Sequence, residues 1–200
     1  EPWRMFGLGS SDDVFDPADA FVPDHLPDPG AFLSGHDLLT GDDHVEFHRV
    51  STEIFEARGI YDVTFGYNLG RLNLDARHPD AGFRYARDAD DPSTIRAEFT
   101  PTTPFCPQSK TLVVGASRAW NDRAADSDRA VDSGADSDRA VDPDVDADID
   151  FDRVAVRVAE MHHRSEAVNA TLEALETARS ASIDSEPEDG RDGVTDQSHR

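Results

Sequence analysis

The sequence has one cysteine, Cys106, and one lysine, Lys110, among its 200 residues. A single cysteine excludes an intrachain disulfide, so the thiol content gives no indication of export. No apolar run approaches the roughly 18–20 residues that a membrane span needs. The opening residues EPWRMFGLGSSDD also lack the basic flank and the apolar stretch of a secretory signal. These absences predict a cytoplasmic protein without a membrane span.

Basic residues are scarce as well, since 19 Lys and Arg stand against 42 Asp and Glu and the net charge is −23. Such an excess of acid repels phosphate backbones and anionic lipid headgroups, so neither nucleic acid nor a membrane is an expected partner. Asp outnumbers Glu by 31 to 11, and Arg outnumbers Lys by 18 to 1. This bias resembles the surface chemistry of extreme halophiles. The alternative is a partly disordered acidic protein at ordinary salt.

The first 40 residues are rich in Pro, Gly and Asp and show no sustained periodicity. They predict an extended acidic arm over residues 1–40, laid on the domain through Phe15, Phe21 and Phe32. Two hundred residues fit one ordinary domain with tails, or one domain with a long insertion. Because only 37% of the residues are hydrophobic, we do not expect the whole length to be packed core. That domain is expected at residues 41–180.

An Asp-rich segment interrupts this domain at residues 121–150. It contains the octapeptide ADSDRAVD twice, at 125–132 and 135–142. A segment of this composition buries too little apolar surface to offset its chain entropy, so we predict a disordered insertion. Its alternating Asp residues are weakly similar to a calcium loop, but the Gly and the terminal Glu of an EF-hand are missing. Residues 181–200 are likewise expected to be a disordered tail.

Periodicity places helices and strands in the remainder of the chain. Apolar residues recur at helical spacing from Phe47 to Ala57 and again from Val168 to Leu175, where Ser165 is the expected N-cap. Ile95, Ala97 and Phe99 alternate with polar residues, as in a half-buried strand. The predicted helices are 43–58, 109–120 and 165–179, and the predicted strands are 94–101 and 153–161. Residues 60–65 and 69–76 are expected to be strands or a strand-edged loop, and 76–93 is expected to connect two strands. This mixture predicts an α/β (α+β) fold.

Cys106 falls in the turn between a predicted strand and a predicted helix, within EFTPTTPFCPQSK. Three prolines fix several backbone angles of this turn, and Pro107 suits an early helical position because its missing N–H has no partner to lose. A sulfur beside the first turn of a helix faces unpaired N–H groups, which favour the thiolate, and Lys110 adds a positive charge nearby. We therefore expect a reactive thiol; the alternative is a small buried apolar cysteine.

The run FTPTTPFCP resembles the metal–sulfur cluster biosynthesis family, which includes cytosolic iron–sulfur targeting factors and the assembly factor of the phenylacetyl-CoA ring oxygenase. The residues that carry this resemblance are Thr100, Pro101, Thr102, Pro104 and Cys106. HHRSEAVNATLEAL, at 162–175, is similar to the segment that opens the last helix of the eukaryotic members, and NLGRLN, at 68–73, is similar to their Leu-Gly-Leu turn. The resemblance covers about 67–178 and implies a small two-layer domain of three to four strands.

The resemblance also implies that the chain assists iron–sulfur cluster assembly or delivery through Cys106, with iron–sulfur apoproteins or assembly scaffold proteins as partners. One thiolate cannot hold a cluster, which typically needs four protein ligands. Cys106 would therefore bind a cluster or iron transiently, or pair with its copy in a homodimer. His162 and His163 are candidate extra ligands, although solvent exposure is the expected state of both. The supporting residues are Thr100, Thr102, Thr103, Pro104, Pro107, Lys110, Ser165, Glu166 and Asn169.

Three alternatives remain open. His44 and His48 share a helix face in HVEFH, which is compatible with zinc, but a third ligand is missing and an exposed helix start is the favoured interpretation. Thr103-x-x-Cys106-Pro107 resembles the peroxidatic motif of peroxiredoxins, whose thiolate attacks a peroxide, although Phe99 stands where that motif has a proline. The chain would otherwise be a salt-adapted interaction module without chemistry.

Overall fold

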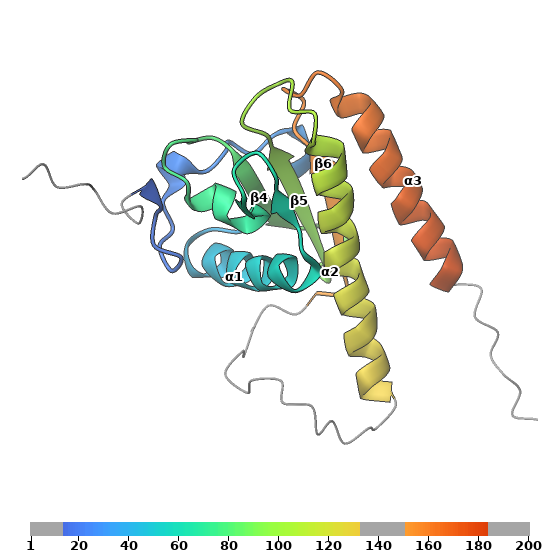
Figure 1. The fold of residues 1–200 in the computed structure, drawn as a ribbon. Helices are drawn as coiled ribbons and strands as arrows, with labels where there is room; N and C mark the ends of the chain where they lie inside the picture. Colours follow the sequence, from blue (N-terminus) through green and yellow to red (C-terminus); the bar gives the residue numbers. More distant parts are fainter. Residues whose placement is uncertain (1–13, 133–150, 184–200) are drawn as a thin grey trace, which may run out of the picture.

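A computed structural model describes residues 14–132 and 151–183 of the chain (Figure 1). Within those residues, no helix is long and apolar enough to cross a membrane. The helices and strands are, in chain order, the 3₁₀ helices η2 (Pro23–His25) and η3 (Ala31–Leu33), β1 (Asp37–Leu38), α1 (Gly41–Arg58), β2 (Tyr61–Asp62), β3 (Tyr67–Asn68), the 3₁₀ helix η4 (Leu69–Leu74), β4 (Gly82–Arg87), β5 (Thr94–Thr100), α2 (Ser109–Asp132), β6 (Arg153–Val158) and α3 (Ser165–Ile183).

The main sheet has four strands in the order β1-β4-β5-β6, and β2 and β3 form a separate hairpin. The pairs β1–β4 and β4–β5 are antiparallel, whereas β5 and β6 are parallel. Parallel neighbours need a crossover connection, and α2 lies in the segment between β5 and β6. The mixed sheet and its helices confirm the predicted α+β class.

One face of the sheet packs against α1 and α2. Alternate residues of β5 and β6 are fully buried, because successive side chains of a strand point to opposite faces. Trp120 of α2 lies at the centre of this core with no exposed surface, and its ring contacts those of Phe55 and Phe83. Its indole Nε1–H donates to the Ser51 hydroxyl at 3.0 Å. These buried side chains anchor α1 and α2 to the sheet. Strand β5 leads from this core into the loop that carries Cys106, residues 101–108, which we call the thiol loop.

Side chains from two helices close the free edge of β6. The Asn121 amide of α2 accepts from the N–H of Val154 and donates to its carbonyl, both at 3.0 Å. The Asn169 amide of α3 makes the same pair of bonds with Val158, at 2.8 and 3.0 Å. Between them, Glu176 accepts one further N–H of the strand at 3.2 Å. An open edge would leave these backbone groups unpaired, and Figure 1 shows α3 standing beside α2 at this edge of the sheet.

The segment of residues 14–40 packs over the side of α1 that carries His44 and His48. It also covers the outer face of the sheet, which is the face opposite α1 and α2. Its C-terminal part contributes the short edge strand β1, and the Glu98 carboxylate on the outer face accepts the N–H of Gly30 at 2.7 Å. A Cβ at Gly30 would overlap that carboxylate, so a larger residue there would displace the end of the Glu98 side chain. The phenylalanines expected to anchor this segment each lie against an arginine: Phe15 under Arg71, Phe21 under Arg84, and Phe32 under Arg96.

Three sequence expectations are wrong in their details. The predicted connection at 76–93 contains β4, a central strand that is buried on both faces and so shows no alternation. The segment 69–76, predicted as a strand or a strand-edged loop, is mostly the 3₁₀ helix η4, where the Asn68 side chain accepts the N–H of Gly70 and stabilises the turn. The predicted insertion starts too early, because α2 continues to Asp132 through the first ADSDRAVD copy. The second copy and the tail beyond 183 lie outside the described residues.

Candidate functional site

Cys106 lies in the loop between β5 and α2 and is partly buried. Its N–H donates to the Thr103 carbonyl at 3.3 Å, and its own carbonyl accepts the N–H of Ser109 at 3.4 Å. These bonds form two successive tight turns. The predicted position between a strand and a helix start is confirmed, but Pro107 precedes α2 by two residues and is not itself helical.

A second loop, between β6 and α3, contacts the thiol loop and forms hydrogen bonds with its backbone. Both loops follow parallel strands and therefore meet at the same end of the sheet, at the top of Figure 1. His162 Nε2 donates to the Cys106 carbonyl at 3.1 Å, since a carbonyl can only accept. The Nδ1 atom of His162 then accepts the N–H of Arg164 at 3.2 Å. Both nitrogens are engaged and only 3% of His162 is exposed, so the expected exposure of this residue is wrong and its ring holds the loop.

His163 contacts the same loop but remains exposed. Its backbone N–H and its ring Nδ1–H both donate to the Pro104 carbonyl, at 2.9 and 2.8 Å. Its ring lies 5.2 Å from that of Phe105, measured between centroids. The donation fixes the ring and leaves the Nε2 lone pair available, as in many histidines that bind metals. Among the described residues, however, no three His, Cys, Asp or Glu side chains are grouped as a metal site would require.

The other predicted supporting residues occupy varied positions around this loop. Thr100 ends β5, whereas Thr102, Thr103, Pro104 and Pro107 belong to the loop itself. Lys110 is exposed in the first turn of α2, and Glu166 lies in the first turn of α3, where a carboxylate favours the helix dipole. Ser165 is the first residue of α3, and its hydroxyl donates to the Glu160 carbonyl at 3.5 Å instead of capping the helix as predicted.

Asn169 is a support for the fold through its two bonds to Val158. Replacing Asn169 with alanine is expected to lower the free energy of unfolding by about 1–3 kcal/mol, because two backbone groups lose their partners. The rate of Cys106 alkylation in the folded protein should not change. Urea unfolding and iodoacetamide labelling measure the two effects, with the exposed Thr177 of the same helix as the control (Thr177→Ala). A large change in labelling without a loss of stability would instead place Asn169 in the thiol site.

His44 and His48 form a second cluster, on the buried side of α1. Their rings stack with centroids 5.8 Å apart, and only 4% of each residue is exposed. His48 Nε2 donates to the Gly70 carbonyl, while its Nδ1 accepts from the Tyr85 hydroxyl, both at 2.9 Å. Burial lowers the pKa of His48 to about 4. The favoured interpretation of an exposed helix start is therefore wrong, because residues 16–26 cover this part of α1.

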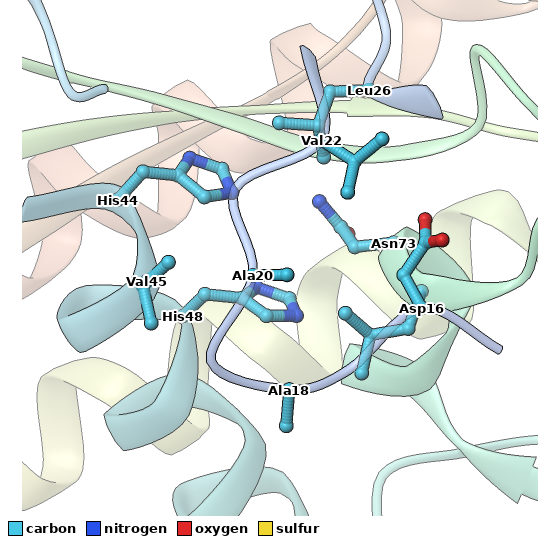
Figure 2. A pocket seen from close by; sticks show the side chains of 10 residues that line it. Asp16, Ala18, Ala20, Val22, Leu26, His44, Val45, His48 and Asn73 are labelled. Atoms are coloured by element: carbon cyan, nitrogen blue, oxygen red, sulfur yellow. The ribbon is translucent and has the colours of Figure 1, made fainter. Parts of the chain in front are cut away.

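The Nδ1 atom of His44 is buried without a hydrogen-bond partner. Burial, the neighbouring His48 and the charge of Arg84 together lower the pKa of His44 to about 3. His44, His48 and the segment above them line a cavity of about 10 Å³, which is room for a single water molecule (Figure 2). No sequence pattern predicts this cavity, because residues 16–26, which cover it, show no periodicity.

No curated protein and no solved structure matches the chain. One family model matches residues 13–133, more than half of the chain. The matched part includes β1 to β5, the Cys106 loop and the buried histidine pair, and it ends before β6 and α3. The chain therefore belongs to the family described as a domain of unknown function, DUF7998.

Proposed function

We propose that this chain is an accessory factor in iron–sulfur cluster assembly or delivery, and that it acts through the thiol of Cys106. The observation that carries the proposal is the way the thiol loop is held. Two histidines from the β6–α3 loop donate to the carbonyls of Cys106 and Pro104, so a partly exposed cysteine is held by a fixed backbone. A fixed, accessible thiol can bind a cluster iron transiently while a partner supplies the other ligands.

The surroundings of the thiol suit contact with another acidic protein. Residues 99–121 contain no Asp or Glu, although the chain has 42 of them. Two large apolar side chains are exposed beside the loop, Phe105 at 72% and Met161 at 43%. Carboxylates elsewhere on the surface would repel an acidic partner, whereas residues 99–121 carry none; the carboxylates of the adjoining β6–α3 segment are Glu160 and Glu166. The same acidic composition is the basis for proposing that the chain works in concentrated salt, so its assays belong there.

Cluster transfer tests the proposal directly. A scaffold protein that carries a cluster is mixed with an apo-ferredoxin in high salt, with or without the purified chain, and circular dichroism follows the formation of holo-ferredoxin. We expect the chain to accelerate transfer and the Cys106→Ser variant to leave the rate of the mixture unchanged. The Thr111→Ala variant, at an exposed position one turn into α2, is the matched control and should accelerate transfer like the original chain.

The exposed apolar residues favour a second candidate, an interaction module without thiol chemistry. Under that function, Cys106→Ser would keep its partners and Phe105→Asp would lose them. Under the first, Cys106→Ser would lose transfer even where it still binds the scaffold. If the chain and its Cys106→Ser variant accelerated cluster transfer equally, the proposed role of the thiol would be rejected. If the chain consumed peroxide and this activity depended on Cys106, the proposed function would be replaced by that of a peroxidase.

A further inference from the structure

Large apolar side chains are exposed at only one end of the part of the chain that the structure describes. There are four of them, Tyr61, Val63, Phe105 and Met161, and Val63 is the most exposed at 77%. Tyr61 and Val63 belong to the β2–β3 hairpin, Phe105 to the thiol loop and Met161 to the β6–α3 loop. Single exposed apolar residues are ordinary, whereas a group of them on adjoining segments marks an interaction site.

Hydrogen bonds join these three segments, with the thiol loop in the middle. The Gln108 side chain reaches the hairpin turn, where its Oε1 accepts the N–H of Val63 at 3.4 Å and its Nε2 donates to the Thr64 hydroxyl at 2.6 Å. On the other side, His162 and His163 donate to two carbonyls of the thiol loop. The exposed apolar side chains therefore share one surface. We call it the thiol end and define it as residues 61–65, 99–121 and 159–167.

Phe105 is held in place although it is exposed. Its ring lies against the ring of His163, which is itself fixed by the Pro104 carbonyl. Aromatic residues and methionine are enriched in protein–protein interfaces. A side chain that is already held loses less conformational entropy when a partner covers it. Phe105 therefore has the properties of an interface anchor.

The thiol end also differs from the rest of the chain in its charge. Its acidic and basic residues are equal in number: Asp62, Glu160 and Glu166 against Lys110, Arg118 and Arg164. The whole chain has a net charge of −23, so the other residues carry all of the excess. Repulsion of this size opposes contact between two copies through any other part of the surface. Because complementary potentials meet across an interface, a neutral surface fits a neutral one, and a second copy offers such a surface.

We propose that the thiol end is the interface of a symmetric homodimer, in which the exposed apolar side chains of two copies pack together around a two-fold axis. Such an interface uses the same patch on both copies, so each apolar side chain contributes twice, and charges of both signs at its rim can pair across the axis. The pairing does not require the thiol. It would bring a second Cys106 near the first, and the use of both thiolates for a transiently bound iron rests on the proposed function.

Sedimentation equilibrium of the full chain in concentrated potassium chloride tests the pairing. We expect a single monomer–dimer equilibrium. Phe105→Asp should raise the dissociation constant at least about a hundredfold, because an anchor is lost from both copies and a charge enters the contact. Val63→Asp should also raise it. Both side chains are exposed, and circular dichroism checks that the variants remain folded.

Thr177→Asp is the matched control, since it adds the same charge at an exposed position of α3 outside the thiol end. It should keep the dissociation constant of the original chain. A chain that stays monomeric up to about 1 mM would overturn the proposal. So would an equal weakening by Thr177→Asp and Phe105→Asp, because added charge and not the apolar contact would then be responsible.

The single cysteine reports where the interface lies. A short bis-maleimide should join two copies through Cys106, and Phe105→Asp should suppress this cross-link. A dimer that is not cross-linked, although a simple maleimide labels Cys106, would overturn the proposed position of the interface. Cys106→Ser should still form the dimer. A dimer that does not accelerate cluster transfer would therefore reject the proposed function alone, and a monomer that accelerates it would reject the homodimer alone.

Discussion

Replacing Asn121 with alanine is expected to lower the free energy of unfolding by roughly 3–5 kcal/mol, since two buried backbone groups of Val154 lose their partners at once. Asn121 is 7% exposed, and the helix that carries it packs tightly on β6. Its amide nitrogen also donates to the Ser117 carbonyl at 2.7 Å. Water has little access to replace these bonds. The Asn121 side chain therefore forms the pair of hydrogen bonds with Val154 that a neighbouring strand would otherwise form.

Asn121→Asp separates the acceptor from the donor in this arrangement. A carboxylate can still accept the Val154 N–H, but it cannot donate to the Val154 and Ser117 carbonyls and would repel both oxygens. We expect this variant to be at least as unstable as Asn121→Ala near neutral pH and to recover as the carboxyl is protonated. Urea unfolding at pH 7 and pH 5 measures this, and Asn169→Ala is the comparison at a half-buried position. If Asn121→Ala lowered the free energy of unfolding by no more than an ordinary surface substitution does, water would be shown to replace the side chain as the partner of the Val154 N–H and carbonyl.

Elements with one buried face were predictable from the sequence, whereas elements that are buried all round were not. The alternation at Ile95, Ala97 and Phe99 identified β5, and helical spacing identified α1 and α3. β4 was missed because it is covered on both sides, by the helices and by residues 14–40, and so carries Phe83 and Arg84 next to each other with both buried. A strand of this kind shows no period of two, and its arginine looks like a loop residue.

The length of α2 was underestimated for a different reason. The Asp-rich composition after Asn121 indicates that such a segment cannot bury a core. A helix that is already formed, however, adds each further residue with one hydrogen bond and needs no new nucleus. The first half of α2 is anchored by Val113, Ala116 and Trp120, all fully buried, and the helix extends from there to Asp132.

The candidate site was also only partly predictable from the sequence. The position of Cys106 between strand and helix follows from local pattern, and the approach of His162 and His163 follows once β6 pairs in parallel beside β5. The tautomers of these rings, which decide whether they hold the loop or remain available, depend on carbonyl positions that no sequence pattern contains. The burial of His44 depends on a covering segment that is distant in sequence and has no period of its own.

Acidification from pH 7 to pH 5 is expected to destabilise the fold through the two buried histidines. The pKa of His44 is lowered to about 3 and that of His48 to about 4, against an ordinary value of 6.5 in the unfolded chain. The neutral forms therefore contribute their full stability above about pH 6.5, and this contribution declines as the pH falls from there toward the folded-state values. At pH 5 each histidine costs about 2 kcal/mol, because one pKa unit corresponds to about 1.4 kcal/mol.

Substitutions can separate the loss of stability that the two histidines cause at low pH from the pH response of the many surface carboxylates. A net charge of −23 means that protonation of surface carboxylates relieves repulsion and stabilises the fold, in the opposite direction to the histidines. His44→Phe removes the unpaired Nδ1 and should make the loss between pH 7 and pH 5 smaller by about 2 kcal/mol. His78→Phe, at a half-buried position against the Phe65 ring, is the control and should leave the loss unchanged.

The position of His44 decides how this test is interpreted. His44 is faced by His48 from its own helix, by Arg84 and Tyr85 from β4 and by Phe21 from the covering segment, none of which is an acid. Asp16 is the carboxylate among the residues that line the cavity, and it is already engaged by His25. Its charged form therefore requires residues 16–26 to lift and admit water. A pH dependence that is the same in the original chain and in His44→Phe would mean that this segment is already open in solution. The buried donors of His44 and Arg84 would then be hydrated.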